Sequence, residues 1–251
     1  MGAFAVEGYR LLERAISAGA PIEHVVVSER EYRAPSARMA KILRDIEQLV
    51  GPVVCVPESV MEKLGEGRTL GAIHALVRLP AECDLGRWMD SLEAGGLGFR
   101  LLVLEEMMDP GNVGALMRTA HALGVAGLVA IGGTDPFHPR AARTSMGSVF
   151  RLPVFRVKNR NEVCVAFRAR GVQMVGAATE AATELPDADF KGDKMALFVG
   201  NEGQGLSLDM RTELDCLVKI PMGDAIDSLS VNAATAVILY GMMPRLRAQP
   251  Q

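Results

Sequence analysis

Several features that would assign this chain to a particular protein class are missing from its sequence. The 251 residues include only four cysteines, at positions 55, 83, 164 and 216, and they form no C-x-x-C pair. Neither a metal site nor a disulfide framework is therefore indicated, and reduced thiols in a cytoplasmic protein are the interpretation we favour. No uninterrupted apolar run is long enough to span a bilayer, and no signal peptide pattern follows Met1, so we expect no membrane association.

The chain also lacks the excess of positive charge that many nucleic-acid-binding proteins carry. Its formal net charge is −3, from 27 basic and 30 acidic residues. The distribution matters more than the total, however, because residues 136–161 contain six basic side chains and no acidic one. A solvated surface is the alternative interpretation of this stretch. If it lies beside a functional site, Arg140, Arg143 and Arg151 are candidates for contacts to a phosphate backbone.

Composition divides the chain into two folded parts. Residues 1–80 mix helix-like runs with short β-branched runs, which predicts a small α/β domain with helices over Val6–Ala18 and Ser36–Leu49 and with strands over 24–28, 53–56 and 72–77. Residues 81–98 carry acids and glycines, and we expect them to be a linker. In residues 99–251, apolar runs alternate with helical patterns, which is typical of a parallel sheet; the expected strands cover 101–104, 127–131, 172–177, 195–199 and 217–220.

Three polar, glycine-containing segments follow expected strands in the second part. In the first, the turn Asp109-Pro-Gly leads into a helix predicted over Val113–Leu123. Asn112 and Arg118 occupy its beginning, which is where α/β proteins place groups that handle ligands. Two simpler interpretations stay open. Asn112 could serve only as a helix N-cap, and Arg118 could form only an interdomain salt bridge.

The second segment, residues 196–207, is a strand followed by a glycine-rich turn and a helix. Its glycines run G-x-x-G-x-G, the reverse of the dinucleotide fingerprint, and no acidic residue closes a Rossmann unit in the expected way. A glycine-rich cradle is therefore expected, but not an NAD site. Glu202, in the middle of the turn, is either a functional carboxylate or a solvated turn residue.

The third segment covers residues 218–232. A short strand ends at Pro221, a glycine turn follows, and an apolar run then continues to Tyr240. Asp227 and Ser228 are the candidates for the N-cap of the following helix. Such a turn exposes backbone N–H and C=O groups beside a helix N-terminus, which suits binding of a polar small molecule.

In this order and spacing, the three segments resemble the signature motifs of the SpoU/TrmH family of RNA ribose 2′-O-methyltransferases, which belong to the SPOUT superfamily. The matching elements are N-x-G-x-x-x-R from Asn112 to Arg118, V-G-N-E-G-Q-G-L at 199–206, and I-P-M-G-D-A-I-D-S-L at 220–229. The stretch from Val6 to Gly19 and the Thr69–Ile73 element look like the family's N-terminal substrate-binding domain. The resemblance implies a parallel-sheet domain with a deep trefoil knot, a small α/β domain before it, and a homodimer whose interface adjoins the cofactor site.

The resemblance also implies a cofactor and roles for individual residues. S-adenosylmethionine would be held through Gly200, Ile220, Met222, Ser228 and Leu229. Arg118, Asn112 and Glu202 would form the catalytic group. A guanidinium has no acceptor site, so we favour Arg118 as an electrostatic stabiliser of the phosphate and the developing alkoxide rather than as a base.

One departure from the family pattern leaves alternatives open. The third motif usually closes S-L-N-V-S, whereas this chain has Ser228-Leu-Ser-Val-Asn232. The function we predict is ribose 2′-O-methylation of RNA, with ribosomal RNA favoured over transfer RNA. An RNA-binding factor that lost turnover through the Ser230/Asn232 exchange is an alternative, and a nucleotide-dependent oxidoreductase is a weaker one.

Overall fold

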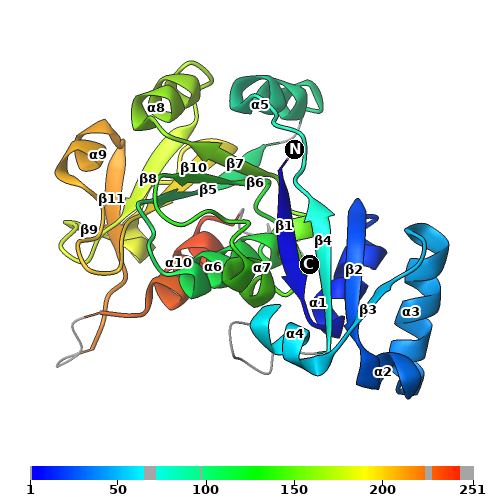
Figure 1. The fold of residues 1–251 in the computed structure, drawn as a ribbon. Helices are drawn as coiled ribbons and strands as arrows, with labels where there is room; N and C mark the ends of the chain where they lie inside the picture. The colour runs from blue at the N-terminus through cyan, green and yellow to red at the C-terminus, as the bar shows by residue number, and fades with distance from the viewer. Residues whose placement is uncertain (1, 65–71, 97, 224–227, 244–251) are drawn as a thin grey trace, which may run out of the picture.

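The computed structural model describes residues 2–64, 72–96, 98–223 and 228–243, and these form two sheets (Figure 1). A four-stranded sheet lies in the N-terminal part, and a seven-stranded sheet forms the rest of the fold. Among the described residues, no helix is both long enough and apolar enough to cross a membrane. The Asp227 N-cap candidate and positions 69–71 of the Thr69–Ile73 element lie outside the described residues.

The N-terminal sheet has the order β1 (Ala3–Glu7), β4 (Ile73–Arg78), β2 (Ile22–Ser28), β3 (Val54–Val56). Its helices are α1 (Tyr9–Ser17), α2 (Glu29–Arg33), α3 (Ala37–Leu49) and α4 (Glu58–Leu64). The helix predicted from Val6 was wrong at its start, because residues up to Glu7 pair antiparallel with β4 and form a strand. Gly8 separates strand from helix with a φ of 83°, a conformation that L side chains rarely adopt.

The second sheet is entirely parallel, in the order β7-β6-β5-β10-β8-β11-β9. Its strands are β5 (Phe99–Glu105), β6 (Gly127–Ile131), β7 (Val154–Val157), β8 (Gln173–Ala177), β9 (Thr183–Glu184), β10 (Lys194–Val199) and β11 (Cys216–Lys219). The α/β class and all five expected strands are confirmed. The two strands missed by the sequence analysis, β7 and β9, are the edges of the sheet, where short strands are buried on fewer sides and leave a weaker apolar pattern.

Helices cover both faces of this sheet (Figure 1). One face carries α6 (Pro110–Ala122), α7 (Pro139–Thr144) and α10 (Val231–Gly241), and the other carries α5 (Leu85–Ala94), α8 (Arg160–Arg168) and α9 (Leu208–Glu213). Strands buried on both faces read as continuous apolar runs, as Leu101–Leu104 does.

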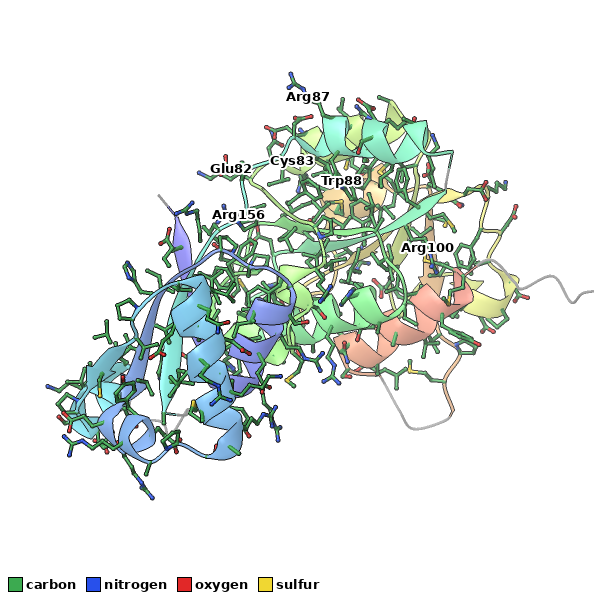
Figure 2. The ribbon with its side chains drawn as sticks, turned by 90° about the vertical axis from the view of Figure 1, so that its right-hand side faces the viewer. Glu82, Cys83, Arg87, Trp88, Arg100 and Arg156 are labelled. Carbon is green, nitrogen blue, oxygen red and sulfur yellow. The ribbon has the colours of Figure 1, made fainter. Side chains whose placement is uncertain are left out.

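The segment expected to be a linker contains helix α5, which packs on the sheet. Asp84 caps this helix by accepting a hydrogen bond from the Arg87 N–H at 2.8 Å. Met89 is fully buried, and the Trp88 ring lies 4.8 Å from the Phe155 ring, whereas Arg87 points away from the body of the molecule (Figure 2). Helix α5 therefore adds to the core of the parallel-sheet domain.

The two domains share an apolar core. The Phe4 ring of β1 lies 5.2 Å from Phe137 and 6.0 Å from Phe150, and both of these belong to the second domain. A salt bridge of 3.0 Å joins Glu7 on β1 to Arg143 on α7. The N-terminal domain is thus fixed against the α6–α7 side of the sheet domain.

Candidate functional site

A cavity of about 690 Å³ lies at the carboxyl ends of β8, β10 and β11. Parallel α/β sheets bind ligands at this edge, because the loops that leave neighbouring strands meet there. The lining combines all three sequence segments and includes every residue predicted to hold the cofactor: Gly200, Ile220, Met222, Ser228 and Leu229. Asn112 and Glu202 also line it.

The glycine-rich loop from 200 to 205 forms the floor of this cavity as a closed turn. The Gly205 N–H donates to the carbonyl of Asn201 at 2.8 Å, and a Cβ at Gly200 would clash with the backbone of Gly205. Gly205 itself has a φ of 67°. The turn therefore needs glycine at both positions, and its glycines line the cavity together with Asn201, Glu202 and Gln204.

The first and second segments are joined by hydrogen bonds. The Asn112 side-chain amide donates to Glu202 Oε1 at 2.8 Å, and the Asp109 N–H donates to the same oxygen at 3.4 Å. Asn201 Nδ2 donates to the carbonyl of Glu106 at 3.1 Å. The helix N-cap is Asp109, whose carboxylate accepts from the Asn112 N–H at 2.9 Å. The interpretation of Asn112 as the N-cap is therefore wrong.

Arg118 is exposed on α6 and is not among the residues that line the cavity. It lies six residues beyond Asn112, and at about 3.6 residues per turn this places the two side chains on different sides of the helix. Within the described residues Arg118 forms no ion pair, and the interdomain arginine is Arg143. The structure thus brings Asn112 and Glu202 together and leaves Arg118 facing solvent on the same helix.

The third segment begins its helix later than predicted. Ser230, rather than Ser228, is the N-cap of α10, and its hydroxyl accepts from the Ala233 N–H at 3.3 Å. Ser228 stays exposed at the cavity, beside Leu229. Asn232 accepts a hydrogen bond of 2.8 Å from the Thr119 hydroxyl of α6. In the Ser230/Asn232 exchange, one residue therefore caps α10 and the other ties α10 to α6.

The basic stretch is largely occupied by contacts within the chain. Arg143 pairs with Glu7, and Arg151 donates to the carbonyl of Ser17 at 3.1 Å. Further pairs are Arg156 with Asp135 and Glu82, and Arg160 with Asp209. Arg140 is about half exposed and lies 3.5 Å from Asp109, close to Asn112 in the chain. Among the three arginines predicted to contact RNA, Arg140 is thus the one beside the cavity, while Arg143 and Arg151 hold the domains together.

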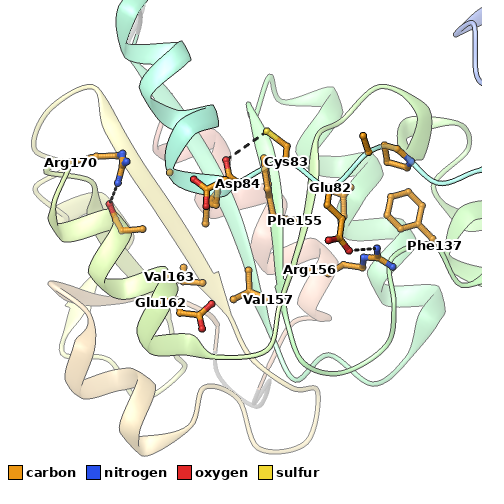
Figure 3. Close-up of a pocket in the computed structure, with 16 residues that line it drawn as sticks. Glu82, Cys83, Asp84, Phe137, Phe155, Arg156, Val157, Glu162, Val163 and Arg170 are labelled. Carbon is orange, nitrogen blue, oxygen red and sulfur yellow. Dashed lines mark hydrogen bonds and ion pairs between the residues drawn. The ribbon is translucent and has the colours of Figure 1, made fainter. Parts of the chain in front are cut away.

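A second cavity, of about 480 Å³, lies between α5, α8 and the edge strand β7 (Figure 3). Arg156 faces Glu82 at 3.7 Å across it. Arg170 binds Asp90 on α5 at 2.8 Å and the carbonyl of Ala166 at 3.0 Å. The guanidinium groups of Arg156 and Arg170 are therefore paired with neighbouring acceptors.

Three polar residues near the main cavity were missed by the sequence analysis. Glu105 is buried at the end of β5 and accepts hydrogen bonds from Ser207, the N-cap of α9. Thr235 on α10 lines the cavity with a buried hydroxyl that has no hydrogen-bond partner in the part of the chain that the structure describes. The sequence held a signal for two of them. Glu105 is a charged residue that ends an apolar run, and Ser207 directly precedes a helix.

The solved structures most useful for comparison share this fold and this arrangement of domains. The SpoU methyltransferase AviRb from Streptomyces viridochromogenes, in complex with AdoMet, aligns over 96% of this chain and 89% of its own, with a TM-score of 0.79 and 29% identity. An AdoMet-bound rRNA methyltransferase from Sinorhizobium meliloti aligns over 96% of this chain and 86% of its own, with a TM-score of 0.76 and 26% identity. The fold is therefore that of the SpoU-type methyltransferases.

Sequence comparison identifies the family. The model of the SpoU rRNA methylase family matches residues 100–240, and the model of the MRM3-like substrate binding domain matches residues 1–74. The 23S rRNA (uridine(2479)-2′-O)-methyltransferase of Streptomyces viridochromogenes is 32% identical over 98% of this chain and 84% of its own length. The 23S rRNA (guanosine(2553)-2′-O)-methyltransferase RlmP of Bacillus subtilis is 28% identical over 94% of this chain and 87% of its own length. The chain belongs to the SpoU rRNA methylase family, which confirms the predicted resemblance.

Proposed function

We propose that this protein is an S-adenosylmethionine-dependent methyltransferase that modifies a ribose 2′-hydroxyl in ribosomal RNA. The proposal rests on one observation: at the carboxyl edge of the parallel sheet, hydrogen bonds join the segment after β5 to the glycine turn after β10. The glycine turn lines one cavity together with Ile220, Met222, Ser228 and Leu229, and the hydrogen-bonded residues Asn112 and Glu202 line it too.

The residues present fit this cofactor. The missing Cβ at Gly200 lets the backbone of Gly205 pack directly against it, which closes the turn at the edge of the cavity. Among the described residues the buried Thr235 hydroxyl has no hydrogen-bond partner, and a buried polar group of this kind calls for one from a ligand or water. Met222 and Leu229 add apolar surface, which suits a heterocycle. The site thus combines backbone groups, one unsatisfied hydroxyl and apolar side chains.

The cofactor, when bound, supplies an electrophilic methyl group, and the protein has to align the ribose with it. The ribose hydroxyl loses its proton in the reaction, so positive charge near the developing alkoxide accelerates transfer. Arg118, exposed on α6, can meet the RNA phosphate and that oxygen from the solvent side. Asn112 lines the cavity and orients the ribose oxygen there, and Glu202 fixes the Asn112 amide by accepting a hydrogen bond from it.

RNA binding is assigned to two surfaces. The N-terminal domain over residues 1–80 supplies the first, and Arg140, beside the cavity, supplies a phosphate contact. Ribosomal RNA is favoured over transfer RNA because the rRNA enzymes compared above align with both domains of this chain. A solved tRNA modifying enzyme of the TrmH/SpoU type from A. aeolicus aligns with 62% of it, at a TM-score of 0.52 and 25% identity.

The assembly we propose is a homodimer in the cytoplasm, with a trefoil knot in the parallel-sheet domain. Helix α10 supports the dimer, because its sequence contains no charged residue although one side faces solvent. On that side Tyr240 is 71% exposed and Val237 is 42% exposed. An exposed helix side that carries Val237 and Tyr240 and no charge is suited to burial, and a second copy of the chain would cover it.

Two measurements test the proposal. Calorimetry on the purified protein should detect S-adenosylhomocysteine and give no heat with NADH. Heat from NADH alone would replace the methyltransferase with the oxidoreductase alternative. Mapping of methylated riboses in RNA from a deletion strain should then reveal one lost 2′-O-methyl group in ribosomal RNA. A loss confined to transfer RNA would reassign the substrate, and an unchanged RNA would favour the factor without turnover.

A further inference from the structure

Glu105 is a buried carboxylate at the end of β5, where the polypeptide turns toward the site. Only 5% of the Glu105 surface is exposed to solvent. Its two oxygens accept from one residue, Ser207, whose N–H lies 2.9 Å from Oε2 and whose hydroxyl lies 2.6 Å from Oε1. Among the described residues no lysine or arginine forms an ion pair with it. A buried charge in this situation depends strongly on those two hydrogen bonds.

The N–H, the hydroxyl and the carbonyl of Ser207 all take part in hydrogen bonds. Besides the two bonds that it donates to Glu105, its hydroxyl accepts from the Met210 N–H at 3.1 Å and so caps α9. The residue before it, Leu206, is buried, and its carbonyl accepts from Arg211 Nε at 2.9 Å. The carboxyl end of the glycine loop is therefore fixed at Ser207.

The chain that follows β5 also contacts the beginning of the glycine loop. The carbonyl of Glu106 accepts from Asn201, and Asn112 donates to Glu202. Glu105 differs from these contacts because it is not among the residues that line the cavity. Its side-chain hydrogen bonds among the described residues are to Ser207, two positions after the loop ends.

We infer that Glu105 is a positioning residue for cofactor binding: by holding Ser207 it keeps the glycine loop in its closed turn before the cofactor arrives. A loop that is already ordered loses less conformational freedom on binding, so it binds more tightly. This inference rests on the placement of S-adenosylmethionine in the main cavity. It adds a residue that does not touch the cofactor and that none of the three sequence motifs contains.

The test uses Glu105→Gln, which keeps the size of the side chain but loses one acceptor and the charge, and Ser207→Ala, which removes the hydroxyl partner. Hydrogen exchange of the amides from 201 to 207 should be faster in both variants without any ligand. The Kd for S-adenosylhomocysteine and the KM for S-adenosylmethionine should each rise on the order of tenfold, with kcat changed less than about twofold. The double variant should bind no more weakly than the weaker single variant, because both changes remove one contact.

Asp215→Asn is the matched control. Asp215 also accepts a backbone hydrogen bond, from the Met174 N–H at 2.7 Å, but at the start of β8, away from the loop. It should lower the free energy of unfolding and leave the Kd and the loop exchange unchanged. If wild type binds and both Glu105→Gln and Ser207→Ala match it in exchange and in Kd, the inference is overturned and the proposed function stands. If Glu105→Gln fails to fold, Ser207→Ala decides alone. If wild type binds no S-adenosylhomocysteine, the proposed function fails and this inference with it.

Discussion

Asn112 and Glu202 are 90 positions apart in the sequence, yet the Asn112 amide donates to Glu202 Oε1 at 2.8 Å. Asn112 lies in the first turn of α6, which follows β5, and Glu202 lies in the loop that follows the neighbouring parallel strand β10. Because parallel strands release their loops at one edge, a short polar contact can fasten two distant segments there. The hydrogen bond thus converts two separate motifs into one site.

Asn112→Ala and Glu202→Ala should each lower kcat/KM for methyl transfer roughly ten- to hundredfold, since a hydrogen bond to a charged group contributes about 1.5–3 kcal/mol. The double variant should lose little more than the worse single variant, because both remove the same contact. Transfer of labelled methyl groups to ribosomal RNA measures this. Fully additive losses would mean that the two side chains act independently.

Arg118→Ala should reduce kcat by roughly two to three orders of magnitude while leaving the Kd for S-adenosylhomocysteine nearly unchanged. The reason is that Arg118 lies outside the cavity lining but can meet the RNA. Arg118→Lys should restore little, because lysine lacks the bidentate fork. Single-turnover rates and calorimetry separate the two effects. An equal loss of cofactor affinity would contradict the assigned role.

A fragment that starts at Pro80 should be more stable than one that starts at Phe99. The longer fragment keeps α5, whose Met89 is buried and whose Trp88 packs on Phe155. Loss of a single buried Met or Trp side chain costs about 2–5 kcal/mol, so deletion of the whole helix should be at least as costly. Urea unfolding compares the two fragments. Both should methylate RNA poorly without the N-terminal domain, and full activity of either would refute the substrate-domain assignment.

Arg143→Ala and Arg140→Ala should have different consequences. Arg143→Ala leaves the Glu7 carboxylate, with a side chain only 12% exposed, without its partner, and should cost about 1–3 kcal/mol of unfolding free energy. Arg140→Ala should be nearly neutral for stability but weaken RNA binding. If Arg140 contacts a phosphate, the slope of log K against log salt should become shallower by about 0.7–0.9. A salt slope that changes only with Arg143 would reverse the assignment.

Burial lowers the pKa of His74, although the nearby Glu7 acts in the opposite direction. A pKa that is lower in the folded state means that the fold favours the neutral imidazole. The resulting stability is complete above the unfolded value of 6.5 and is lost as the pH falls below it. Urea unfolding between pH 8 and pH 5 should therefore show a loss on the acid side that His74→Gln reduces. Parallel curves for the two proteins would exclude His74 as the cause.

Local sequence patterns were sufficient to predict the inner strands of the parallel sheet. The central strands are buried on both faces and read as unbroken apolar runs, so five of them could be predicted from Leu101–Leu104 onward. The edge strands β7 and β9 were missed because they are short and buried on fewer sides. The last two residues of β1, Val6 and Glu7, were taken for the start of a helix, because their pairing with β4 is not visible in the local sequence pattern.

The ion-pair and hydrogen-bond partners of the charged residues, in contrast, could not be predicted from their neighbours in the chain. The basic stretch appeared to be one surface, but Arg143 and Arg151 turn to the N-terminal domain and Arg140 to the cavity. A guanidinium pairs with whatever acceptor the fold brings near it, and for the arginines of this basic stretch the acceptors lie up to 136 positions away.

The sequence by itself determined the chemistry available at the site: the glycines of the turn, the Asn112 amide, the Glu202 carboxylate and the order of the three motifs. These depend on residue type and local spacing, which folding does not change. Only the tertiary structure decided which groups meet. It placed Asn112 against Glu202, left Arg118 on the outer side of its helix, and enclosed Glu105 with Ser207. Such contacts follow from how the strands order themselves in the sheet, and that order depends on packing over the whole chain.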